Sequence, residues 1–251
     1  MRNAIPEARE EMIVGRKRSP PRIAVLIASH DNVPVTFAYD LSLMLTYTAS
    51  ELPEGAELGI QLAAGTYVHE ARQDLIVSAL EDRVTHMLWL DADMRFPRDT
   101  LVRLLVHNVP VVGANYATRG VPSDFVAIKK VNWNPDEPGE RLYTGPDSTG
   151  LEEVEAVGMG VLLTRADAFQ SMPDPRVDPW FFFQKIPGKD GGFRLLGEDV
   201  YFCKLLREAG NRILVDHDLS QDIAHTGQFD FKTIHATVEY AGRRLEEEGT
   251  E

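Results

Sequence analysis

This sequence of 251 residues has no means of forming an internal disulfide and no long apolar run. Its one cysteine, Cys203, has no partner within the chain, so the fold is compatible with a reducing compartment. No segment approaches the roughly 20 apolar residues that cross a bilayer, which predicts no membrane span. Arg16, Lys17 and Arg18 are not followed by an apolar segment with a cleavage site, so we expect no signal peptide and a cytoplasmic location.

Basic side chains are fewer than acidic ones, with 26 Lys and Arg against 39 Asp and Glu and a formal net charge of −13. A surface that binds nucleic acid indiscriminately needs clustered Lys and Arg to contact phosphates, so this balance argues against one. A local basic groove remains compatible with the charge. What the chain does have is a hydrophobic fraction of 43%, which is enough to fill the core of one sizeable domain.

The first half of the chain alternates between short apolar runs and amphipathic segments. The apolar runs, typical of strands buried on both faces, are residues 23–28, 58–63, 86–90 and 109–112. Helical spacing marks residues 35–50 and 68–80, and Pro97 suits the first turn of a third helix. This order predicts a doubly wound sheet of parallel strands, in which ligands bind beyond the carboxyl ends of the strands.

The second half is less regular, and we expect it to share the same sheet. Residues 116–150 and 173–192, rich in Pro, Asp and Gly, are predicted to be long loops. Gly158 and Gly160 interrupt a strand candidate at 154–164. The remaining predicted elements are a helix at 198–209, a strand at 212–215 and an acidic helix at 232–248.

Asp91 and Asp93 follow directly on the apolar run 86–90. Two carboxylates about 5 Å apart repel by roughly 3 kcal/mol at an effective dielectric constant near 20, so such a pair is costly without a cation. A divalent ion that shares phosphate oxygens with the two aspartates relieves the repulsion. The alternative is an ordinary polar turn after a strand.

Glu198 and Asp199 open the later helix, directly after Gly197. Acidic residues in a first helical turn are favoured by the helix dipole, which is a sufficient structural reason for them. The functional interpretation is that one of the two accepts or orients the proton of a substrate hydroxyl. The aromatic and glycine-rich segment before them is of the kind that closes over a substrate.

His225 and Arg72 complete the set of candidate site residues. An imidazole beside carboxylate and phosphate shifts metal preference from magnesium toward manganese, although a lone histidine is more often a packing residue. The other histidines show no zinc-site spacing. Arg72 either pairs with a phosphate, or supports a nucleotide site, or is a solvated helix residue.

These motifs, in this order, resemble the glycosyltransferases of the GT-A fold, and more narrowly the family-2-like enzymes often met in bacteriophage genomes. The resemblance covers about residues 22–227. The matching segments are the strand 23–28 with Ser29-His30-Asp31, Gly65 with Ala71-Arg72, Leu88 to Pro97, Val112-Gly113-Ala114 with Tyr116, Gly158 with Gly160, Gly197-Glu198-Asp199-Val200, and His225.

The resemblance implies a Rossmann-like mixed α/β sheet flanked by helices in a single domain. It divides the chain into a nucleotide-sugar-binding half at 22–114 and an acceptor-binding half at 115–231. The polar composition of the two ends predicts a flexible N-terminal arm at 1–21 and a C-terminal acidic helix at 232–251. A phage-encoded enzyme of this kind would lie in the host cytoplasm.

The resemblance also assigns roles to single residues. Residues at the nucleobase and ribose would be Ala28, Ser29 and Asp31, with Arg72 nearby. Asp93 is expected to ligate Mn²⁺ (or Mg²⁺) together with His225, and Asp91 to contact the ribose or to join the ion through water. Glu198 and Asp199 inherit the catalytic role on the acceptor side.

The implied reaction transfers a sugar from a nucleoside diphosphate sugar to an acceptor hydroxyl, with inversion or with retention. A nucleotidyltransferase is a weaker alternative, since residues 29–34 lack the glycine-rich, basic loop that such enzymes carry. A non-catalytic sugar- or nucleotide-binding module is the other alternative.

The acceptor is left open between a hydroxylated DNA base and a glycan or protein. A DNA acceptor requires a basic patch, and scattered solvated side chains are the alternative interpretation of the same residues. The basic side chains of the two long loops that would form such a patch are Arg119, Lys129, Lys130, Lys185, Lys189 and Arg194.

Overall fold

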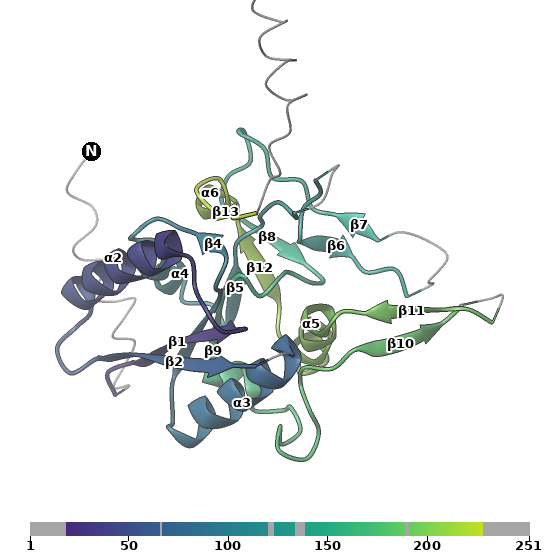
Figure 1. Ribbon diagram of the computed structural model, residues 1–251, viewed down its shortest axis with the longest axis horizontal. Coiled ribbons are helices and arrows are strands. Elements are labelled where there is room, and N and C mark those ends of the chain that lie inside the picture. The colour runs from purple at the N-terminus through teal and green to yellow at the C-terminus, as the bar shows by residue number, and fades with distance from the viewer. Residues whose placement is uncertain (1–18, 66, 120–122, 134–138, 189–190, 228–251) are drawn as a thin grey trace, which may run out of the picture.

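In the computed structural model, the described residues are 19–65, 67–119, 123–133, 139–188 and 191–227. The flexible arm expected at 1–21 lies outside this part of the chain except for its last three residues, and the acidic helix expected at 232–251 lies outside it entirely. Figure 1 shows a central twisted sheet with helices on both sides and a hairpin, β10–β11, that projects from the body. No helix in the described ranges is long and apolar enough to cross a membrane.

The central sheet has seven strands in the order β2-β1-β3-β9-β5-β12-β8. The strands are β1 (Arg22–Ser29), β2 (Glu57–Ala64), β3 (His86–Asp91), β5 (Val111–Gly113), β8 (Leu151–Val154), β9 (Val161–Arg165) and β12 (Ile213–Asp216). Strands β1, β2, β3, β5 and β12 run in one direction, and β9 and β8 run against them. The mixed sheet that the family resemblance implied is confirmed.

Helices cover both faces of this sheet (Figure 1). The helices are α2 (Val35–Glu51), α3 (Val68–Glu81), α4 (Thr100–Val106), α5 (Glu198–Glu208) and the short α6 (His217–Ser220). Alternate residues of β1 belong to two separate core clusters, since successive strand side chains point to opposite faces. Helices α3 and α5 contribute to the cluster on one face, and α2 and α4 contribute to the other.

Strand β9 is the main departure from the sequence prediction. It lies antiparallel between β3 and β5, so the four expected parallel strands are not consecutive neighbours. The predicted strand at 154–164 is wrong as one element, because β8 and β9 are separate strands in different parts of the sheet. Gly158 and Gly160, which interrupted the pattern, lie in the connection between them.

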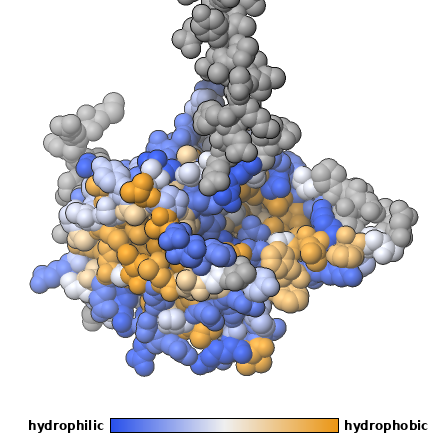
Figure 2. Space-filling view, in the orientation of Figure 1, coloured by the Kyte–Doolittle hydropathy of each residue, from blue (hydrophilic) through white to orange (hydrophobic). Residues whose placement is uncertain are grey.

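The predicted loops contain further strands. Residues 173–192 were expected to be a loop, but the hairpin β10 (Gln184–Pro187) and β11 (Phe193–Leu196) begins there. Residues 116–150 contain the antiparallel pair β6 (Ile128–Lys130) and β7 (Glu140–Arg141). A 3₁₀ turn, η1 (Ala166–Phe169), follows β9. Figure 2 shows apolar surface on the β10–β11 hairpin, where Phe193 and Leu195 are exposed.

The helix predicted to start at Pro97 starts later. Helix α4 begins at Thr100, and the Pro97 carbonyl accepts hydrogen bonds from both the backbone N–H and the hydroxyl of Thr100. Pro97 therefore closes the turn before the helix. Proline suits this place because it has no N–H of its own to satisfy.

Candidate functional site

The site lies at the carboxyl end of β3, where Asp91 ends a strand that is buried along its middle. Ala28 of β1 pairs in register with Asp91, and Ser29 follows it at the same edge. The expected donor-side residues Ala28 and Ser29 therefore do adjoin Asp91. Asp31 lies in the exposed turn beyond them, within 3.7 Å of His30.

A short antiparallel pair brings the late histidine to this edge. Strand β13 (Ala224–His225) pairs with β4 (Met94–Arg95), with His225 opposite Met94. The backbone N–H of Thr226 also donates to the Asp93 carbonyl at 2.8 Å. These backbone bonds fix His225 beside Asp93, with its Nε2 3.3 Å from Asp93 Oδ2. The association of Asp93 with His225 that the resemblance implied is present in the fold.

The imidazole of His225 is oriented through its other nitrogen. Its Nδ1 lies 3.2 Å from the carbonyl oxygen of Ala117, which accepts only, so Nδ1 carries the proton. In neutral His225 the Nε2 lone pair then faces the Asp93 carboxylate. Two lone pairs in this arrangement need a proton or a metal ion between them, and a backbone carbonyl that accepts from Nδ1 is a common partner of a metal-ligating histidine.

The Asp93 carboxylate has one oxygen that is not satisfied. Its Oδ1 is buried and has no hydrogen-bond partner among the described residues. Its Oδ2 also receives Arg119 Nη1 at 2.9 Å, and the Arg119 side chain is 54% exposed. A buried carboxylate oxygen without a partner is costly in a protein but natural in a ligand of a divalent cation.

These residues fit a divalent ion that is completed by substrate oxygens. Within the described ranges, no three His, Cys, Asp or Glu side chains converge to form a cage of their own. Asp93 and His225 would supply two protein ligands to such an ion, with the remaining positions open to phosphate oxygens and water. A mixed carboxylate and imidazole donor set suits Mn²⁺ as well as Mg²⁺.

Asp91 is engaged elsewhere, by a buried arginine. Arg72, which is 5% exposed, donates from Nη2 to Asp91 Oδ1 at 2.6 Å and from Nη1 to Glu198 Oε1 at 2.8 Å. Burial works to lower the pKa of Arg72, but the Asp91 and Glu198 carboxylates raise it above its usual value. Of the roles considered for Arg72, a solvated side chain is therefore wrong.

Asp199 lies beside this bridge in the first turn of α5. Its Oδ1 accepts the backbone N–H of Val200 at 2.7 Å. Burial raises the pKa of Asp199 above its usual value, and the negative charge of Glu198 adds to the shift. A carboxylate with a raised pKa is a better proton acceptor near neutral pH, as a general base requires.

Tyr116 is part of the site although the sequence assigned it no role. Its ring packs edge-on against His225, with centroids 5.6 Å apart, and its hydroxyl accepts the Gly160 N–H at 2.8 Å. Burial raises the pKa of Tyr116, so the hydroxyl stays protonated. Tyr116, Gly158 and Gly160 all belong to segments that carry the family resemblance, so the sequence does contain a signal for this contact.

Gly158 and Gly160 are needed because the Tyr116 hydroxyl occupies the space that a Cβ at either position would take. A Cβ on Gly160 would overlap the Tyr116 hydroxyl and approach Met94 Sδ to 2.9 Å. We expect Gly160→Ala to lower the free energy of unfolding by about 1–3 kcal/mol, as overpacking typically does. Urea unfolding measures this change. The control is Gly59→Ala on β2, where a Cβ meets nothing within 4 Å; equal destabilisation of both variants would contradict the account.

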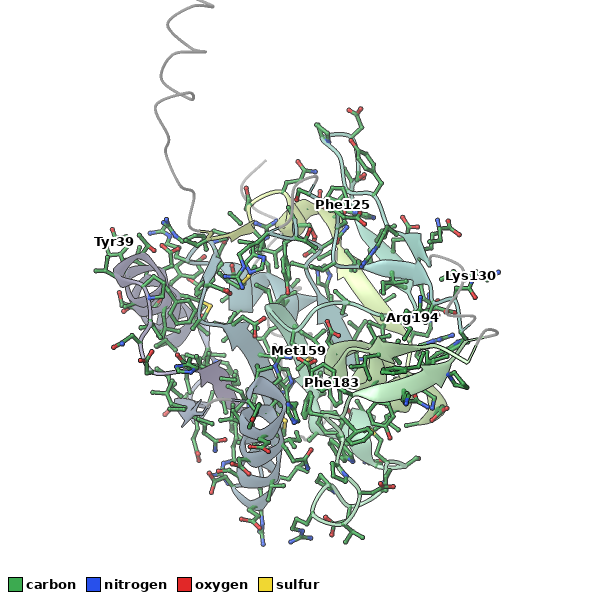
Figure 3. The ribbon with its side chains drawn as sticks, turned by 45° about the vertical axis from the view of Figure 1, so that its right-hand side comes forward. Tyr39, Phe125, Lys130, Met159, Phe183 and Arg194 are labelled. Atoms are coloured by element: carbon green, nitrogen blue, oxygen red, sulfur yellow. The ribbon has the colours of Figure 1, made fainter. Side chains whose placement is uncertain are left out.

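Several of the basic side chains that would form a DNA-binding patch are engaged by other groups of the protein. Lys129 pairs with Glu152 at 2.8 Å, and Arg194 donates to the Asn132 carbonyl. Figure 3 shows Lys130 and Arg194 toward the outer edge formed by β6 and β11, and Met159 and Phe183 nearer the centre. Lys185 lies over the Phe193 ring, and Lys189 is outside the described residues.

The fold and the site together define an α/β protein with acidic residues at the carboxyl edge of its sheet. No protein-family model matches the chain. One curated relative is the mannan polymerase complex subunit MNN9 of Candida albicans (strain SC5314 / ATCC MYA-2876), 30% identical over 143 residues. The match covers 52% of this chain and 36% of the relative, so it spans about a third of that protein's length.

Three solved structures are similar to this chain at low sequence identity. A197 from STIV is 14% identical, with coverages of 84% of this chain and 97% of that chain and a TM-score of 0.48. GalNAc-T7, solved with UDP, GalNAc and Mn²⁺, is 10% identical, with coverages of 84% and 44% and a TM-score of 0.48. A glycosyltransferase involved in the glycosylation of the major capsid of PBCV-1 is 14% identical, with coverages of 83% and 95% and a TM-score of 0.41. Similarity at this level leaves residue equivalences undefined.

Proposed function

We propose that this chain is a glycosyltransferase of the GT-A, family-2-like type, which moves a sugar from a nucleoside diphosphate sugar to an acceptor hydroxyl with the help of a divalent ion. The observation that carries the proposal is the Asp93 carboxylate. One of its oxygens is buried without a partner, and the other faces the Nε2 of His225. The name of the curated relative, a mannan polymerase complex subunit, supports glycosyl transfer as the class of reaction.

On the donor side, Asp93 and His225 would hold Mn²⁺ or Mg²⁺, and Asp91 is the secondary partner. The ion would neutralise the charge that develops on the departing diphosphate. Ala28 and Ser29 adjoin Asp91 at the strand edge and are suited to the nucleoside. Asp31, which is exposed in the following turn, is assigned to the nucleoside by resemblance alone.

On the acceptor side, Asp199 or Glu198 would act on the acceptor hydroxyl. In an inverting enzyme one of them removes the hydroxyl proton as the oxygen attacks the sugar carbon. The ion pair of Glu198 with Arg72 favours Asp199 for this task, because the Glu198 carboxylate is already engaged by the guanidinium. In a retaining enzyme both carboxylates would position and stabilise instead.

The acceptor is a glycan, a protein or a hydroxylated DNA base. The ion pair between Lys129 and Glu152 removes one cation from the groove that DNA requires, so a glycan or protein is the favoured acceptor. Changing Lys129 and Lys130 together to glutamate separates the two cases. It abolishes modification if DNA is the acceptor and leaves transfer to a glycan or protein unchanged.

The test of the proposed function is turnover of nucleotide sugars. The protein is incubated with Mn²⁺ and a panel of nucleotide sugars that includes mannose donors, and release of nucleoside diphosphate is measured. Release from one donor, lost on chelation of the metal, supports glycosyl transfer. Release of pyrophosphate from nucleoside triphosphates and sugar phosphates would instead identify a nucleotidyltransferase.

A binding module without catalysis predicts a different result. Any ligand of the native state must raise the melting temperature. Stabilisation by Mn²⁺ with a nucleoside diphosphate but no turnover of any donor would favour the binding module. The absence of both stabilisation and turnover would contradict the proposal altogether.

Arg119 competes with a metal ion for Asp93, because its guanidinium already contacts Oδ2. We expect Arg119→Ala to bind Mn²⁺ about 1.5- to 5-fold more tightly when no nucleotide is present. This range follows from the worth of exposed ion pairs, about 0.2–1 kcal/mol. Calorimetry measures the affinity, and Arg141→Ala, whose partner is Asp124, is the control. Weaker binding of Mn²⁺ by Arg119→Ala would contradict competition.

A further inference from the structure

One buried guanidinium joins the two halves of the site. Arg72 lies in α3, Asp91 ends β3 and Glu198 begins α5. Arg72 reaches Asp91 across 19 residues of sequence and Glu198 across 126 residues. The side chains of Arg72 and Glu198 are 7% and 12% exposed, so water screens their interaction weakly. The three side chains depend on one another, because removing one of them leaves a buried charge unpaired.

This geometry does not suit a phosphate ligand. The two terminal nitrogens of Arg72 are already occupied by carboxylates at 2.6 and 2.8 Å. A phosphate would have to reach a guanidinium whose side chain is only 7% exposed, and it would be repelled by the two carboxylates already beside it. Arg119, whose side chain is 54% exposed, is the accessible guanidinium at the same edge.

The helix that carries Arg72 is itself held in place. The neighbouring Gln73 donates to the Pro175 carbonyl at 2.6 Å and accepts the Trp180 backbone N–H at 2.9 Å. One turn earlier, the ring of His69 packs edge-on against Phe183, with centroids 5.2 Å apart. These contacts tie α3 to the segment that leads through the β10–β11 hairpin into α5. A side chain on such a support is preorganised.

We propose that Arg72 is a positioning residue, which holds the donor-side carboxylate Asp91 and the acceptor-side carboxylate Glu198 at a fixed separation and does not bind the donor phosphates. The inference rests on the proposed glycosyl transfer. Its consequence is that Arg72 acts mainly on the rate of transfer, whereas the affinity for Mn²⁺ and a nucleoside diphosphate, which depends on Asp93 and His225, stays nearly unchanged. Lysine cannot replace it, because one ammonium lacks the planar fork that addresses two carboxylates at once.

The experiment compares wild type with Arg72→Lys and Arg72→Gln. Calorimetry with Mn²⁺ and a nucleoside diphosphate gives the donor-side Kd, and steady-state transfer gives kcat and KM. We expect the Kd of Arg72→Lys to stay within about 3-fold of wild type while kcat falls at least 100-fold. Arg72→Gln, which keeps hydrogen bonding without charge, serves if the lysine variant does not fold, and the same split is expected. The control is Arg165→Lys, at an arginine outside the site whose side chain is 15% exposed and paired with Asp167, and its kinetics should be unchanged.

A second readout separates positioning from general support of the fold. Guanidinium at millimolar concentration, added to Arg72→Ala, fills the vacated place and should restore part of kcat, whereas sodium chloride at equal ionic strength should not. A rise in nucleoside diphosphate Kd of 10-fold or more, with kcat retained, would overturn the inference and make Arg72 a donor ligand. Absence of turnover of any nucleotide sugar by the wild type would overturn the proposed function, and the inference with it.

Discussion

Asp93→Asn is expected to abolish metal-dependent transfer and leave the fold intact. The substitution keeps the shape of the side chain but removes the charge that holds a divalent ion beside His225. A metal that stabilises the charge on a leaving group contributes several kcal/mol, which corresponds to a loss of roughly 10³-fold in rate. Steady-state transfer measures the loss, and thermal shift with Mn²⁺ measures the accompanying loss of metal binding.

The control for this variant is Asp222→Asn. Asp222 is another aspartate in an ion pair with an arginine, Arg103, but it lies outside the site. Its rate and its response to Mn²⁺ should equal those of the wild type. Metal-dependent turnover by Asp93→Asn within 10-fold of wild type would show that Asp93 is not the ligand.

Asp199→Asn is the second substitution with a large expected effect. It should lower kcat of transfer without lowering the free energy of unfolding. A general base contributes about 10²–10⁴-fold, so kcat should fall by that factor. Burial raises the pKa of Asp199 above its usual value, so its ionised form costs the fold free energy at neutral pH. The neutral amide removes that cost, and the free energy of unfolding at pH 8 should be equal to or higher than that of the wild type.

The pH dependence gives an independent check on Asp199. The group must be ionised to accept a proton, so kcat of the wild type should fall as the pH is lowered through its raised pKa. The free energy of unfolding should change in the opposite direction to kcat. A carboxyl group with a raised pKa stabilises the fold while it is protonated and loses that contribution as the pH rises. Full activity of Asp199→Asn, with an unchanged acid limb, would transfer the catalytic role to Glu198.

Local patterns predicted the elements of the first half of the fold well. Strand β1 and helices α2 and α3 lie within one residue of the predicted bounds, because each carries its own periodicity of apolar residues. Strand β9 could not be placed in the same way. Its position between β3 and β5 is determined by pairing with residues more than 45 positions away, such as the hydrogen bond from Trp89 to Thr164 across 75 residues.

The candidate site, like the fold, could be predicted only where local sequence carries the signal. The placement of Asp91 and Asp93 at a strand end could be predicted from the sequence, and the resemblance supplied His225 as a neighbour of Asp93. No local signal indicates that Arg72 spans Asp91 and Glu198, because the bridge exists only once α3, β3 and α5 are assembled. Arg119 was likewise not expected at Asp93, since its contact depends on the course of the chain between β5 and β6.

The most direct test of the central account is the position of a bound metal. Crystals of the protein grown with Mn²⁺ and a nucleoside diphosphate would be measured for anomalous scattering by manganese. One strong manganese peak is expected in contact with both Asp93 and His225, with diphosphate oxygens completing the coordination. Bound nucleotide without manganese at Asp93, or a manganese peak elsewhere in the molecule, would contradict it.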